Sequence, residues 1–145
     1  MARSTRTLGL MDSDAMRQLI QRNADELSRL HSRISQTEKL RSHGSAEKQE
    51  WELACAEFHA RFDDLAFPGG FKGALARIEA GDPDAMEAAI CFLEVRPYFV
   101  RSGYMFKDIL KKAKRAPLSE HQAIRLASIM RRLAERRASK GRHEA

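Results

Sequence analysis

Apolar residues along this chain recur at helical intervals, and no segment shows the sustained alternation of a β-strand. From Ser13 onward the apolar positions follow one another at steps of three, four and seven residues, and Ile20, Leu27 and Ile34 share one heptad position. We therefore expect a long amphipathic helix over 13–41 with Ser13 as its N-cap. Packing against the next helix and dimerisation as a coiled coil are both compatible with this pattern.

A second helix is expected after the Ser42–Ser45 turn, because a single helical stripe of large apolar residues follows it. Phe67-Pro68-Gly69-Gly70 ends this helix, since proline disfavours helix at the preceding residue and two glycines allow a sharp turn. The stripe should contribute heavily to the core, and it consists of Trp51, Ala54, Cys55, Phe58, Phe62 and Leu65.

Turn and capping signals divide the second half of the chain. The sequence Gly81-Asp82-Pro83 predicts a tight turn between helices over about 71–80 and 83–95. After Arg96-Pro97 we expect a packed aromatic connector over 98–104, and then a helix over 104–114. Ser119 and Gln122 form a predicted capping box at the start of the last helix. The fold class is therefore all-α, a bundle of about six helices built from antiparallel hairpins.

The chain of 145 residues has the length of one domain. Residues 1–12 lack a periodic pattern and are expected to be a disordered N-terminus, 13–137 a single helical domain, and 138–145 a basic flexible tail. The chain has no apolar run of 18 residues and no signal-peptide core, and two cysteines do not make a disulfide scaffold. We expect a cytoplasmic protein that does not act at a membrane.

The charge is unevenly distributed. Residues 101–145 contain 13 Lys and Arg against 4 Asp and Glu, whereas 1–100 contain 13 against 16, and the whole chain carries +6. A basic end on a mildly acidic body favours a polyanion or an acidic protein as partner. The chain contains no phosphate-binding loop, zinc-protease motif or serine elbow. We therefore expect a binding protein rather than an enzyme, with no cofactor and no metal.

The hairpin from Phe71 to Glu94, with its Gly81-Asp82-Pro83 turn and the small residues Ala85, Ala88 and Ala89, resembles one unit of a HEAT-like helical repeat. Residues 104–133 resemble a second unit, so that the C-terminal half is HEAT-like and the resemblance covers about half of the chain. The block from Phe92 to Tyr104 resembles a segment of small bacterial helical proteins. The resemblance implies a binding scaffold with a protein partner.

The candidate binding face lies on the last two helices. If these pack antiparallel, their cations can line one face, namely Arg101, Lys107, Lys111, Lys112, Lys114, Arg115, Arg125, Arg131, Arg132 and Arg136. We expect this face to contact a macromolecular partner, an acidic protein as for an immunity or adaptor protein. The alternative is that the same face contacts nucleic-acid phosphates. Tyr104 and Phe106 are the only nearby rings in sequence, which argues against base stacking. The pattern leaves the oligomeric state open.

Overall fold

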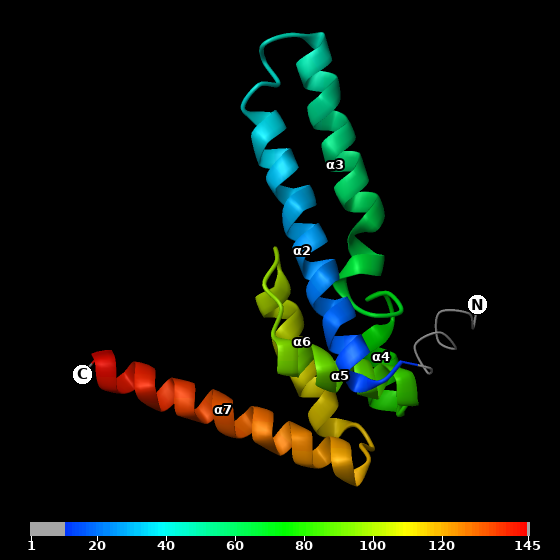
Figure 1. Ribbon diagram of the computed structural model, residues 1–145, viewed down its shortest axis with the longest axis vertical. Helices are drawn as coiled ribbons and strands as arrows, with labels where there is room; N and C mark the ends of the chain where they lie inside the picture. Colours follow the sequence, from blue (N-terminus) through cyan, green and yellow to red (C-terminus); the bar gives the residue numbers. More distant parts are fainter. Residues whose placement is uncertain (1–10, 145) are drawn as a thin grey trace.

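The structure, a computed structural model, describes residues 11–144, apart from the side chains of 142–144. Within this range the fold is all-α and contains no strand, as predicted. Figure 1 shows the six helices, which are α2 (Ser13–Glu38), α3 (Ser45–Ala66), α4 (Ala74–Ala80), α5 (Pro83–Val95), α6 (Ser102–Arg115) and α7 (Glu120–Glu144). The disordered segment expected at 1–12 falls almost entirely on residues 1–10, which lie outside the described residues, as does residue 145.

Helices α2 and α3 form a long antiparallel hairpin whose far end projects beyond the other helices (Figure 1). The apolar face of α2 is covered within the same chain, because α2 packs against α3 along its length and against α5 near its start. Its buried side chains are Met16, Ile20, Ala24, Leu27 and Leu30. Of the two interpretations of this helix, packing within the domain therefore accounts for its apolar stripe.

Helix α5 lies at the centre of the bundle and contacts α2, α4, α6 and α7. Its residues from Ala88 to Phe92 are completely buried, and the alanines among them let neighbouring helices approach closely. Phe92 meets Phe67 and Phe99, with ring centroids 5.9 and 6.5 Å apart. A cluster of phenylalanines thus joins the base of the hairpin to the connector that follows α5.

The capping signals place several helix ends correctly. Gly81 ends α4 at φ 89°, and its N–H donates to the carbonyl of Arg77, as expected of a glycine C-cap. Ser119 and Gln122 form the predicted capping box, each side chain accepting the other residue's backbone N–H at 3.1 Å. The N-cap of α2 was predicted wrongly, because Asp12 accepts the N–H of Ala15 at 2.7 Å and Ser13 is already helical.

Two helix starts differ from the predicted ones. Helix α4 begins at Ala74 rather than 71, because Gly70 and Gly73 adopt left-handed conformations with φ of 91° and 77°. Helix α6 begins at Ser102 rather than 104, because the Ser102 hydroxyl accepts the N–H of Phe99 at 3.1 Å and closes the connector against the first turn. The connector is therefore shorter than expected.

Helix α7 packs against α5 and not, as expected, along α6. Among the described residues, substantial helix packing joins α6 to α4 and α5, and α7 to α5 alone. Figure 1 shows α7 leading away from the bundle, and it continues to Glu144 through most of the segment predicted as a flexible tail, 138–145. The HEAT-like resemblance of the C-terminal half remains a prediction. Within the described part of the chain, every helix is too short or too polar to cross a membrane.

Candidate functional site

A groove of about 990 Å³ lies beside the connector between α5 and α6, and we call it the basic groove. It is lined by the connector and the first turns of α6, by Ser28, His31 and Ser32 of α2, and by Arg136 of α7. Its cations are Arg96, Arg101, Lys107 and Arg136. Segments more than 100 residues apart in sequence thus meet at one surface.

The connector is held rigidly against the core. Phe99 is 4% exposed, and it exchanges hydrogen bonds with Ser102, whose hydroxyl accepts the Phe99 N–H and whose N–H donates to the Phe99 carbonyl at 2.9 Å. The Ser28 hydroxyl donates to the carbonyl of Tyr98 at 3.4 Å. These contacts fix the backbone on which the cations of the groove are carried.

Arg96 and Arg101 flank the connector in left-handed conformations, with φ of 50° and 71°. Among the described residues they are the two non-glycine positions with positive φ, and both line the basic groove. Such conformations cost on the order of 1 kcal/mol or more for a residue with a Cβ, and they persist where surrounding structure holds them. The Arg96 guanidinium lies 4.9 Å from the ring centroid of Phe106, which orients it over the groove.

The groove carries positive charge without a compensating carboxylate. None of its lining residues is Asp or Glu, and within the described range no carboxylate lies within 4.0 Å of the charged nitrogens of Arg96, Arg101, Lys107 or Arg136. The first turn of α6 also faces this groove, and the N-terminal end of a helix adds a partial positive charge. An anion in this groove would therefore contact cations from the connector, from α6 and from α7.

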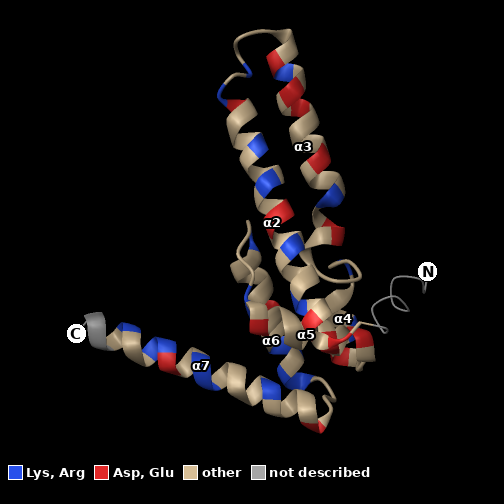
Figure 2. Ribbon diagram, in the orientation of Figure 1, with Lys and Arg blue, Asp and Glu red and all other residues tan. Residues whose placement is uncertain are grey.

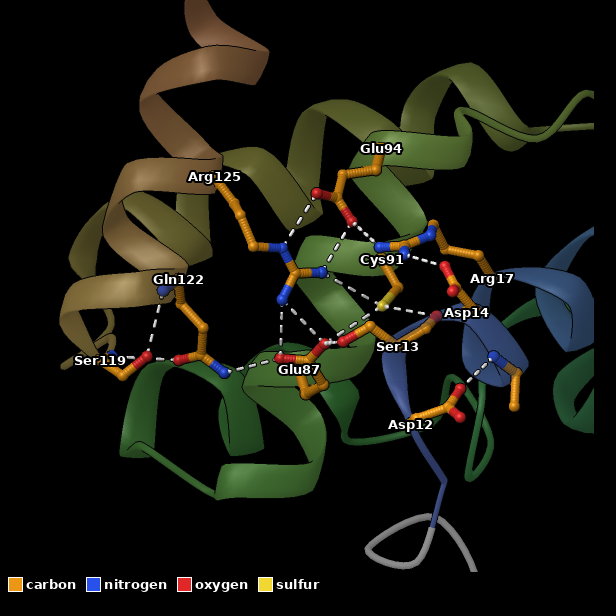
Figure 3. A network of polar contacts seen from close by, with 11 residues as sticks. Asp12, Ser13, Asp14, Arg17, Glu87, Cys91, Glu94, Ser119, Gln122 and Arg125 are labelled. Atoms are coloured by element: carbon orange, nitrogen blue, oxygen red, sulfur yellow. Dashed lines mark hydrogen bonds and ion pairs between the residues drawn. The ribbon is translucent and has the colours of Figure 1, made fainter.

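Helix α7 is held on α5 by a network of polar contacts around Arg125 (Figure 3). The Arg125 guanidinium donates to both oxygens of Glu87, at 3.1 and 2.9 Å, and to both oxygens of Glu94, at 3.0 and 2.7 Å. Ser13 and Arg17 of α2 donate to the same two carboxylates at 2.7 and 2.8 Å. The network therefore ties α2, α5 and α7 together at one point.

This network also sets which side of α7 faces the groove. Arg132 and Arg136 follow Arg125 by about two and three helical turns, so the three side chains project from one face of the helix. Arg132 and Arg136 line a smaller groove of about 160 Å³ that continues from the basic groove past Arg96. The anchored arginine thus positions its two successors along the same surface.

The network shifts the pKa values of its members. Burial acts to raise the pKa of Glu87, but hydrogen bonds from Ser13, Gln122 and Arg125 outweigh burial and bring this pKa to about 2. For Glu94 burial is likewise outweighed, by Arg125 and Arg17, so its pKa is lowered. Burial and the nearby Glu87 carboxylate raise the pKa of the Cys91 thiol to about 12. At neutral pH both carboxylates are therefore ionised and the thiol is protonated.

The ten predicted binding residues fall into three groups. Arg101, Lys107 and Arg136 line the basic groove, and Arg132 lines its continuation. Lys111, Lys114 and Arg131 are exposed but stand outside both grooves. Figure 2 shows basic residues along most of α7, so the C-terminal helices are basic as expected. Only four of the ten predicted cations, however, line the two grooves.

The remaining three predicted residues are engaged within the chain. Arg125 is 12% exposed and belongs to the network described above. Lys112 pairs with Glu79 of α4 at 3.1 Å, and Arg115 lies 3.7 Å from the same carboxylate. The expectation that these cations face a partner is not met for Arg125, because two carboxylates of α5 already surround its guanidinium.

Sequence reasoning missed Arg96 and Tyr98 as groove residues. Arg96 was interpreted only as the end of a helix, and Tyr98 as part of a packed connector, whereas the Tyr98 side chain is 88% exposed. The available signal was the run Arg96–Tyr104, in which two arginines and two tyrosines surround the buried Phe99. Such a run places polar and aromatic side chains on the surface around one buried side chain, that of Phe99.

Other candidate chemistry finds no support in the described residues. Cys55 and His59 lie one turn apart on α3, and no third histidine, cysteine or carboxylate of the described chain joins them in a group that could hold a metal. His31 lies in the groove wall between Ser28 and Ser32, and its ring packs on Phe58 at 5.7 Å. Comparison of the chain with protein-family models, curated proteins and solved structures finds no match.

Proposed function

We propose that this chain is a non-catalytic binding protein that contacts a macromolecular polyanion through the basic groove and the adjoining face of α7. The observation that carries this proposal is the convergence of Arg96, Arg101, Lys107 and Arg136 on one groove whose lining contains no carboxylate. Keeping like charges together without counter-ions is unfavourable in the free protein, and an anionic partner relieves this repulsion.

Of the partner classes that the sequence leaves open, nucleic acid fits the groove better than an acidic protein. A phosphate backbone presents a regular series of charges, and the cations continue from the groove along α7 through Arg132 and Arg136. Three of the four groove cations are arginines, which can donate two parallel hydrogen bonds to one phosphate. The large apolar side chains that are exposed in this groove are both aromatic, namely Tyr98 and Tyr104.

Fluorescence anisotropy with labelled single-stranded DNA, single-stranded RNA and duplex DNA, at low salt, tests the proposal. The groove variant R101Q/K107Q/R136Q removes three cations that line the basic groove. The matched control K111Q/K114Q/R131Q removes three exposed cations from the same two helices and lowers the net charge equally. We expect the groove variant to lose about tenfold or more in affinity and the control to lose little.

Two results overturn the proposal, one for the groove and one for nucleic acid. Equal losses in the two variants would mean that net charge, and not the groove, causes binding. Absence of binding to every oligonucleotide at low salt would exclude nucleic acid and leave an acidic protein as the partner of the groove.

A further inference from the structure

The two tyrosines of the chain are its most exposed large apolar side chains within the described residues. Tyr98 is 88% exposed and Tyr104 is 76% exposed, and both line the basic groove. Large rings left in water at a single location are typical of a binding surface, since burial elsewhere would stabilise the fold.

The backbone that carries these tyrosines is pre-organised. Tyr98 lies between the buried Pro97 and Phe99, and its carbonyl accepts a hydrogen bond from Ser28. Tyr104 lies in the first turn of α6, which Ser102 closes through its hydrogen bonds with Phe99. A ring on a fixed backbone loses little conformational freedom when a ligand stacks on it.

The cations stand beside the rings in sequence as well as in space. Arg96 precedes Tyr98 by two residues, and Arg101 precedes Tyr104 by three. Lys107 follows Tyr104 by three residues, and Lys107 and Tyr104 therefore lie on the same side of α6. Aromatic platforms beside cations that follow a backbone are the arrangement used by proteins that bind single strands.

We infer that the basic groove binds single-stranded nucleic acid, with bases stacked on Tyr98 and Tyr104 and phosphates held by Arg96, Arg101, Lys107 and Arg136. This inference rests on the proposed function and specifies its ligand, because duplex bases are already stacked on each other and offer no free faces to the rings. Every base has a π face, so the groove takes single strands with little preference for sequence.

The test compares Tyr98→Ala and Tyr104→Ala with Tyr98→Phe and Tyr104→Phe, and uses Leu53→Ala on α3, a helix that does not line the groove, as a control. Leu53 is 56% exposed and outside the groove, so its variant measures the effect of removing exposed apolar area in general. The probes are a labelled single-stranded thymidine oligonucleotide, a uridine oligonucleotide and a DNA duplex of equal length. Circular dichroism checks that each variant keeps its helical content.

We expect each alanine variant to bind the single strands about tenfold more weakly, while the phenylalanine variants and Leu53→Ala bind as the unaltered protein does. Duplex binding should be weaker from the start and should not change with the tyrosines. The two single-stranded probes distinguish DNA from RNA as the preferred strand.

If single strands and duplex bind equally and the alanine variants lose nothing, the stacking inference is wrong and the proposed phosphate contact stands. If the phenylalanine variants lose as much as the alanine variants, the hydroxyls rather than the rings carry the contact, which also overturns stacking. If no probe binds at low salt, nucleic acid is excluded as the partner of the groove, and the inference fails with that assignment.

Discussion

Arg125 of α7 donates two parallel hydrogen bonds to Glu94 of α5, from Nε to Oε2 at 3.0 Å and from Nη2 to Oε1 at 2.7 Å. Paired contacts of this kind fix orientation as well as distance. Among the described helices, α5 is the one against which α7 packs substantially. The contact between Arg125 and Glu94 therefore determines where Arg132 and Arg136 lie. This partly buried ion pair therefore helps to position the groove, although neither of its residues lines the basic groove.

Replacement of Arg125 by methionine should destabilise the protein by about 2–4 kcal/mol, because in this partly buried site Glu87 is left without a cation and Glu94 keeps Arg17 alone. Urea denaturation followed by circular dichroism measures the change. Arg131→Met is the matched control, since Arg131 is exposed on the same helix, and it should change the unfolding free energy by less than about 0.5 kcal/mol. Similar unfolding midpoints for the two variants would contradict the anchoring role.

Stability should fall with acid as the network is protonated. The folded-state pKa of Glu87 is about 2, below its usual value of 4.5, so its contribution is fully present above about pH 5 and is lost as the pH falls toward 2. At about 1.4 kcal/mol for each pKa unit, Glu87 accounts for ~3 kcal/mol of unfolding free energy. Urea midpoints at pH 7, 5, 4 and 3 measure this loss.

The variant Glu87→Gln separates this effect from general acid destabilisation. It should be less stable than the unaltered protein at pH 7 and should lose less stability between pH 5 and 3, because the titrating group is gone. An identical pH dependence in both proteins would show that Glu87 does not carry the acid sensitivity.

The two cysteines should differ sharply in reactivity. Cys91 is completely buried and its pKa is raised to about 12, whereas Cys55 is partly exposed on α3. With a thiol-reactive disulfide reagent at pH 8, one thiol should react in the native protein and the second only after denaturation. Peptide mapping of the labelled protein identifies the first as Cys55. Rapid labelling of Cys91 in the native state would contradict its burial.

Gly81→Ala should destabilise the protein by about 1–3 kcal/mol. The residue has φ 89°, and an added Cβ would lie 2.7 Å from Cγ of Pro117, in the segment that joins α6 to α7. Gly141→Ala is the control, because a Cβ at this position in α7 meets nothing within 4 Å. Thermal denaturation should give a lower unfolding midpoint for Gly81→Ala than for the unaltered protein. The midpoint of Gly141→Ala should be unchanged or slightly raised.

Local signals predicted the helices well because they act over a few residues. The capping box of Ser119 and Gln122 and the glycine end of α4 at Gly81 are decided by neighbours in sequence, and both are confirmed. The start of α6 was harder to predict, since Ser102 begins the helix by bonding to Phe99, which is itself fixed by the core.

The candidate site could be predicted only in part, because its geometry depends on distant contacts. Arg125 and Arg132 look alike in sequence, yet Arg125 pairs with two carboxylates of α5, whereas Arg132 shares the small groove with Glu94 without an ion pair between them among the described residues. The clustering of Arg136 with Arg96 depends on the angle at which α7 leaves the bundle, which the Ala116–Leu118 segment does not reveal. Sequence reasoning therefore identified the basic region but not the groove.

The salt dependence of binding tests the central claim most directly. Each phosphate contact with a single strand contributes about −0.7 to the slope of log K against log salt concentration, so contacts by Arg96, Arg101, Lys107 and Arg136 predict a slope of about −3. The groove variant R101Q/K107Q/R136Q should reduce the slope to about −1, while K111Q/K114Q/R131Q should keep it near −3. Equal slopes for the two variants would contradict the assignment of the basic groove as the phosphate-binding surface.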